Sequence, residues 1–116
     1  MSFTGKDVID DARRLTNDVD KKTWSDKEDY LPVLNQVLSL LYTERPECRL
    51  TAVGALTAYA AITDLSKAVA LDDAYRIAVV EYLAYRYHDS DAGEAHDADR
   101  AAEHLGRFNE LIGPSK

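Results

Sequence analysis

The sequence predicts a mainly α-helical, four-helix bundle-like domain with a short β-hairpin or extended arm between its second and third helices. Apolar residues recur at helical spacing in four segments, and helix-capping residues stand where the first three of these segments begin. With 116 residues, 46% hydrophobic and 30% charged, the chain is expected to fold as one domain over residues 1–116.

The first helix is predicted over residues 4–17. Thr4 and Asp7 stand three residues apart and can exchange side-chain to backbone hydrogen bonds at a helix start. The apolar face is expected at spacings of four, three and four residues, in Val8, Ala12, Leu15 and Val19. The charged residues left for solvent are Asp10, Asp11, Arg13 and Arg14.

The second helix is predicted over residues 25–44. Ser25 fits an N-cap, Glu28 its reciprocal partner, and Trp24 the apolar residue that precedes a cap. The helix should end before Arg45-Pro46, because the residue before a proline disfavours helical geometry. Pro32 lies inside the helix, where it removes one backbone hydrogen bond and can kink the axis.

The arm is predicted over residues 47–71, where alanine and threonine dominate. Residues 56–62 fit a weak alternating strand and an alanine-rich helical turn equally well. We prefer a short β-hairpin or extended arm with its turn at residues 63–66.

The third helix is predicted over residues 73–88, capped by Asp72-Asp73, and it is apolar nearly all round. Such a helix must be covered on most sides, and we expect the rest of this small chain to cover about half of it. The remainder is expected to pack against another subunit. The tyrosines of this helix suit either the chain's own core or such an interface. The candidate interface residues are Tyr75, Val79, Tyr82 and Tyr85, with Tyr59 and Ile62 from the arm.

The fourth helix is predicted over residues 94–112. Its expected apolar stripe consists of Ala98, Ala101, Ala102, Leu105, Phe108 and Ile112. Gly113 and Pro114 supply a left-handed cap and a stop.

Charge and composition argue against several classes of function. The chain has 14 basic and 21 acidic residues, a formal net charge of -7, and no run of Lys or Arg longer than a pair. Tight binding to nucleic acid or to an anionic membrane needs clustered cations. A single cysteine, Cys48, excludes an intrachain disulfide and is expected to be a small, partly buried apolar residue. We find no signal peptide or membrane span, and expect a soluble chain made in the cytoplasm.

No motif for catalysis, cofactor binding or metal binding is recognisable. The histidines, His88, His96 and His104, lack metal-ligand spacing and are expected to be solvated on polar helix faces. A polar turn between helices explains the carboxylates at Asp89, Asp91, Glu94, Asp97 and Asp99. We therefore expect no enzyme, no cofactor and no metal site.

Several segments together resemble the head-to-tail adaptor proteins of tailed bacteriophages. The amino-terminal half resembles them in residues 4–13, in Trp24-Ser25-Asp26 with Leu34-Asn35, and in Arg45-Pro46-Glu47. The carboxy-terminal half resembles them in residues 82–86 and 89–92, in residues 99–104, and in Phe108. The segment between the second and third helices is shorter and richer in alanine than is usual in the family.

The resemblance implies a structural virion protein in the neck of the particle. It would form a ring, usually twelve-fold, of copies of itself, between the portal protein and a tail or nozzle protein, with DNA only passing through the channel. The candidate portal contact is the tail, Gly113, Pro114, Ser115 and Lys116. The alternative is a small, acidic helical regulatory module that masks a basic protein partner.

Overall fold

The computed structural model describes residues 3–16, 24–44, 62–69, 71, 75–89 and 97–113. These residues form helices α1 (Gly5–Thr16), α2 (Leu31–Glu44), α3 (Arg76–Asp89) and α4 (Ala98–Ile112), with a π-helical turn η1 (Asp26–Tyr30) directly before α2. The mainly helical class is therefore confirmed. The described residues contain no strand, so the predicted β-hairpin is not shown.

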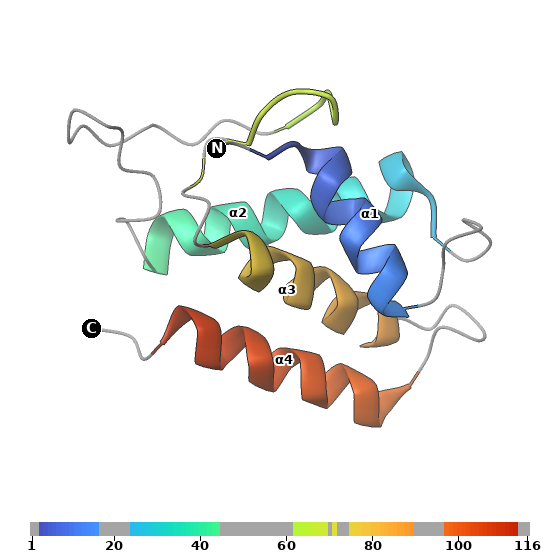
Figure 1. The fold of residues 1–116 in the computed structure, drawn as a ribbon, viewed down its shortest axis with the longest axis vertical. Helices are drawn as coiled ribbons and strands as arrows, with labels where there is room; N and C mark the ends of the chain where they lie inside the picture. The colour runs from blue at the N-terminus through green and yellow to red at the C-terminus, as the bar shows by residue number, and fades with distance from the viewer. Residues whose placement is uncertain are drawn as a thin grey trace.

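Helix α3 is the centre of the fold, because α1, α2 and α4 all pack on it (Figure 1). Helix α4 runs antiparallel to α3, and the ends of the two helices are joined where the Asp97 N–H donates to the His88 carbonyl at 2.9 Å. The buried apolar side chains of the four helices meet in one core. Trp24 and Tyr30 complete this core on the side where they contact α3.

The central position of α3 corrects the expectation that half of it needs another subunit. Eight of its residues are buried within the chain, including Val79 and Leu83, and only Ile77 and Asp89 are exposed. A helix that is apolar on most sides is thus covered by three neighbouring helices. The apolar surface left on α3 is confined to Ile77 and to the edges of half-buried tyrosines.

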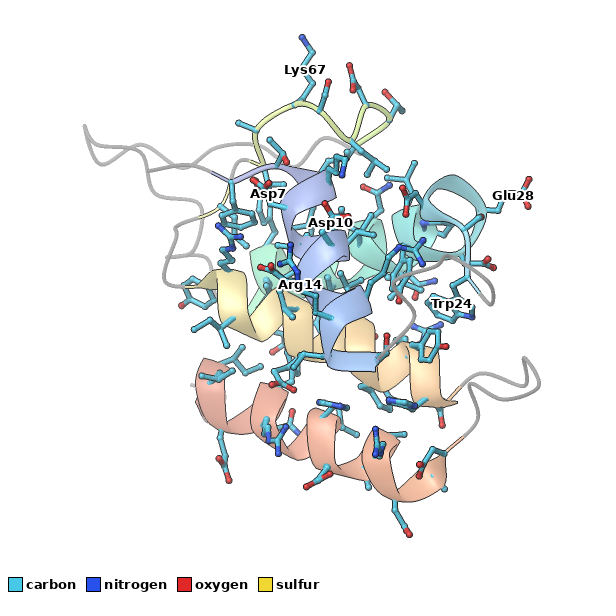
Figure 2. The ribbon with its side chains drawn as sticks, turned by 45° about the vertical axis from the view of Figure 1, so that its right-hand side comes forward. Asp7, Asp10, Arg14, Trp24, Glu28 and Lys67 are labelled. Atoms are coloured by element: carbon cyan, nitrogen blue, oxygen red, sulfur yellow. The ribbon has the colours of Figure 1, made fainter. Side chains whose placement is uncertain are left out.

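The predicted capping pair at the start of α1 is confirmed. The Thr4 N–H donates to the Asp7 carboxylate at 2.9 Å, and the Asp7 N–H donates to the Thr4 hydroxyl oxygen at 3.1 Å. The bond from the Thr4 N–H is the main reason why the pKa of Asp7 lies below its ordinary value of 3.8. Asp7, Asp10 and Arg14 follow one another along α1 (Figure 2).

The second predicted helix is interrupted by the π-helical turn η1. Ser25 is the N-cap as predicted and accepts from the Glu28 N–H at 3.1 Å, but its own N–H donates to Asp29 at 2.8 Å rather than to Glu28. Pro32 is the second residue of α2, directly after the wider turn, and the Leu31 N–H between them donates to the Asp26 carbonyl. The π-helical turn thus occurs where the proline cannot donate the backbone hydrogen bond of a regular α-helix.

Residues 62–69 lie beside the start of α1. Asn35 of α2 holds Ile62 twice: its amide donates to the Ile62 carbonyl at 3.0 Å, and its oxygen accepts from the Ile62 N–H at 2.8 Å. The predicted turn occurs at Asp64, whose carbonyl accepts from Lys67, and Thr4 and Ala68 form an isolated antiparallel bridge. The remainder of the predicted arm, apart from Leu71, lies outside the described residues.

Helix α4 begins later than predicted. Asp97 has extended backbone angles and its side chain accepts from the Arg100 N–H at 3.1 Å, so the helix starts at Ala98 and not at Glu94. Gly113 ends it with a φ of 73°, as the predicted glycine cap requires. Within the described residues, no helix is long and apolar enough to cross a membrane.

Candidate functional site

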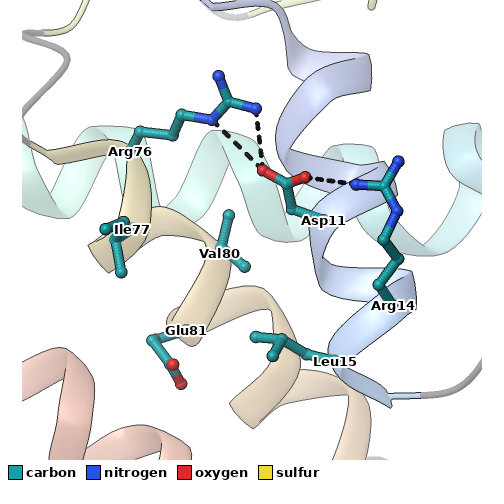
Figure 3. Close-up of a pocket in the computed structure, with 7 residues that line it drawn as sticks. All are labelled: Asp11, Arg14, Leu15, Arg76, Ile77, Val80 and Glu81. Carbon is teal, nitrogen blue, oxygen red and sulfur yellow. Dashed lines mark hydrogen bonds and ion pairs between the residues drawn. The ribbon is translucent and has the colours of Figure 1, made fainter.

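The candidate site is a groove of about 260 Å³ between α1 and α3. Leu15 of α1 and Ile77 and Val80 of α3 supply its apolar lining (Figure 3). Leu15 is 43% exposed and Ile77 63% exposed, although both are large apolar side chains. The prediction that Leu15 faces the core is therefore wrong. The buried face of α1 instead includes Ile9, which is fully buried.

One edge of the groove is a row of three charges centred on Asp11. Arg76 of α3 donates to Asp11 Oδ2 from Nη2 at 2.9 Å and from Nε at 3.3 Å. Arg14, one turn along α1, donates to Asp11 Oδ1 at 2.8 Å (Figure 3). The carboxylate thus joins α1 to α3 and holds both guanidinium groups beside the apolar lining.

The other edge contains Glu81, which contacts α4. Its Oε2 lies 2.6 Å from His104 Nδ1, and both side chains are almost entirely buried. Arg107 approaches the second carboxylate oxygen at 3.9 Å, and the ring of His88 stacks on that of His104 at 5.7 Å. Glu81 is therefore held by groups of α4 and fixes that helix against α3.

The burial of two histidines corrects the expectation that they are solvated. His88 and His104 face the α3–α4 contact, and each is about 5% exposed. His104 takes a position in the buried stripe of α4 that was predicted for alanines, since Ala98 and Ala102 are exposed. His96 lies outside the described residues. Helical spacing alone could not identify Glu81, the carboxylate whose contact lets His104 be buried.

A second buried charge, Arg13, was predicted to face solvent. It is 3% exposed and donates to the Trp24 carbonyl at 2.8 Å and to the Asp26 carboxylate at 2.6 Å. Its guanidinium carbon lies 4.8 Å from the centre of the Tyr30 ring. Arg13 can be buried because Trp24 and Asp26, at the start of η1, supply its partners. The sequence of α1 alone does not show these partners.

The candidate interface residues that the structure describes differ in their exposure to solvent. Val79 is fully buried in the chain's own core, so its assignment to an interface is wrong. The partly exposed candidates are Tyr75, Tyr82, Tyr85 and Ile62. Tyr82 is edge-on to both Tyr85 and Phe108, at 5.6 and 5.0 Å, so it packs mainly within the chain. Tyr59 lies outside the described residues.

Of the candidate portal contact, only Gly113 is described, and it is partly buried as the cap of α4. Pro114, Ser115 and Lys116 lie outside the described residues, so the contact stays a prediction.

The groove combines an apolar lining with charged edges. Its lining residues include no serine, threonine, cysteine or histidine, and its carboxylates, Asp11 and Glu81, are bound to cationic or imidazole groups. Among the described residues, no group of three or more His, Cys, Asp or Glu side chains could hold a metal ion. No protein-family model, curated protein or solved structure matches the chain.

Proposed function

We propose that the chain is a structural virion protein, a head-to-tail adaptor that forms a ring between the portal and the tail around the DNA channel. The observation that carries the proposal is the exposed apolar groove between α1 and α3. Leu15 and Ile77 leave apolar area open to solvent beside an ordered row of charges, which is typical of a surface that another protein covers.

Further support comes from the resemblance of residues 4–13 and 82–86 to the adaptor family. These two segments belong to α1 and α3, the helices that form the groove. The proposed partners are other copies of the chain, the portal protein and a tail or nozzle protein, and the proposed location is the neck of the virion.

The net charge of -7 fits a channel through which DNA passes without sticking. A protein gains affinity for DNA when its cations displace condensed counterions, and an acidic wall offers no such gain. We propose that the surface facing the channel is acidic. A cryo-electron microscopy map of the neck tests this part, and a basic lumen would contradict it.

Sedimentation with assembled portal rings from the same phage tests the main proposal. We expect the chain to sediment with the portal in a fixed ratio, and a variant lacking residues 114–116 to bind less while keeping its helical circular dichroism. Failure of the full chain to bind portal at high concentration would overturn the proposal. Salt-sensitive binding to a lysine-rich protein, without portal binding, would favour the regulatory module instead.

A further inference from the structure

The contact between α3 and α4 contains three buried ionisable side chains, Glu81, His88 and His104, called here the Glu–His cluster. His104 Nδ1 lies 2.6 Å from Glu81 Oε2, and these two side chains are only 7% and 10% exposed. The ring of His104 stacks on that of His88, with centroids 5.7 Å apart and planes inclined by 5°. His104 therefore contacts the carboxylate with a ring nitrogen and the second imidazole with a ring face.

The cluster combines one carboxylate with two imidazoles. Glu81 would balance the charge of one proton on the imidazole pair, and Arg107 already approaches its second oxygen at 3.9 Å. A second proton would place two imidazolium rings in parallel contact at a buried site. Burial disfavours each charged ring, and like charges repel more strongly there than in water. The folded chain therefore resists the second proton.

Other charged and titratable groups of α3 and α4 lie near the cluster. They are Tyr87 and Asp89 of α3 and Asp97, Arg100, Glu103 and Arg107 of α4. Tyr87 is edge-on to His88 at 5.2 Å. Asp97 and Glu103 each lie within 3.6 Å of an arginine of α4, and Asp89 is exposed. Because water and salt screen exposed charges, these carboxylates offset a buried positive charge only weakly.

The elements packed against α3 contribute few charges at the cluster. Arg14 of α1 lines the groove with Glu81 and is paired with Asp11 at 2.8 Å. Two carboxylates of η1, Glu28 and Asp29, line a separate hollow. The charged residue of α2 is Glu44, at the end of α2 that lies beside the start of α3, away from the cluster (Figure 1). Among these carboxylates, Glu81 is the one that the described contacts place against an imidazole.

We propose that the Glu–His cluster is a pH-dependent latch, which holds α4 on α3 at neutral pH and releases it when both imidazoles are protonated. When α4 is detached, both rings lie in water and take up protons freely. The detached state therefore binds more protons than the docked state, so the docked state loses stability as the pH falls. The loss begins near the pH at which an imidazole titrates in water, about 6.5. This inference is independent of the proposed adaptor role.

Hydrogen exchange measured by mass spectrometry at pH 7.5 and pH 5.5 tests the latch. Protection factors, which remove the intrinsic effect of pH on exchange, give the opening of each helix. If opening takes up one proton near pH 6.5, the protection of α4 should fall about tenfold over this range. The protection of α1 should change less than about twofold, since α1 does not depend on the cluster.

His88→Phe keeps an aromatic ring against His104 and removes one of the two charges. The protection of its α4 should be the same at both pH values within about twofold. His96→Gln, which replaces the third histidine of the chain, is the matched control and should keep the tenfold loss of the wild-type chain.

Three results would overturn the latch. They are equal protection of α4 at the two pH values in the wild-type chain, an undiminished loss in His88→Phe, and disappearance of the loss in His96→Gln. A purely structural role of His88 would weaken α4 equally at both pH values and would leave the pH dependence in place. Circular dichroism at pH 7.5 checks that each variant folds. If His88→Phe does not fold, His88→Gln removes the same charge with a smaller side chain.

Discussion

The guanidinium of Arg13 is buried against the carboxylate of Asp26, with Nη2 and Oδ1 2.6 Å apart. This pair fixes α1 to η1 on the side of α1 that faces away from solvent. The Trp24 carbonyl accepts from the same nitrogen at 2.8 Å, so the arginine binds both the residue before the Ser25 cap and the first residue after it. A charge is buried here because its donors are satisfied.

Arg13→Ala should lower the free energy of unfolding by about 3 kcal/mol, because removing one member of a buried ion pair costs far more than removing an exposed charge. Urea denaturation followed by Trp24 fluorescence measures the change. Arg14→Ala, the neighbouring but exposed arginine, should change stability by less than about 0.5 kcal/mol. Equal effects of the two substitutions would contradict the burial of Arg13.

Gly5→Ala should destabilise the chain, although alanine normally favours a helix. A Cβ at Gly5 would lie 2.9 Å from Leu65 Cδ2 and 3.2 Å from Leu34 Cδ2, so both neighbours would have to move. Gly106→Ala in α4 is the matched control, since a Cβ there meets nothing within 4 Å. The control should raise the free energy of unfolding by about 0.5–1 kcal/mol. Stabilisation by both substitutions would contradict the tight packing of Leu65 and Leu34 against Gly5.

Asp7→Ala should cost about 0.5–1 kcal/mol at pH 7, since it removes a carboxylate from the first turn of α1. The pKa of Asp7 is lowered on folding, so its contribution is fully present above the ordinary value of 3.8. The contribution is lost as the pH falls through the lower pKa of the folded chain. Urea denaturation from pH 7 to pH 3 should therefore show the difference between variant and wild type shrinking below pH 4. A constant difference would contradict the capping role of the charge.

Glu81 and His104 should show strong coupling in a double-mutant cycle. Their atoms are 2.6 Å apart and buried, so Glu81→Ala and His104→Ala should each destabilise the chain, and the double variant should lose about 1–3 kcal/mol less than the sum. The exposed pair Glu103 and Arg107 provides the control, with an expected coupling below about 0.5 kcal/mol. Additive effects at Glu81 and His104 would mean that the pair does not hold α4 in place.

Local signals in the sequence predicted the helices well. The reciprocal cap of Thr4 and Asp7, the Ser25 cap and the final glycine at Gly113 depend on residues within a few positions of one another, and the structure contains all three. The start of α4 was misplaced because several acidic residues compete for the cap. Among the described residues, Asp97 is the one that caps α4, since its side chain accepts from the Arg100 N–H.

The site could be predicted far less well, because it depends on contacts between helices. Periodicity placed Arg13 in solvent and Leu15 in the core, and the structure reverses both. The difference arises from Asp26, thirteen residues away in the sequence, which supplies the partner that lets an arginine be buried. Val79 was assigned to an interface because the three helices that cover α3 could not be counted from the sequence of α3 itself.

Helix α4 joins the described part of the chain mainly through α3, since its extensive contacts in the described residues are with that helix alone. An element attached to a single neighbour is expected to open locally at a lower free energy than the whole fold. Helix α4 is therefore the part of the described fold that should separate first, and its opening would expose Glu81 and His88 of α3 to water.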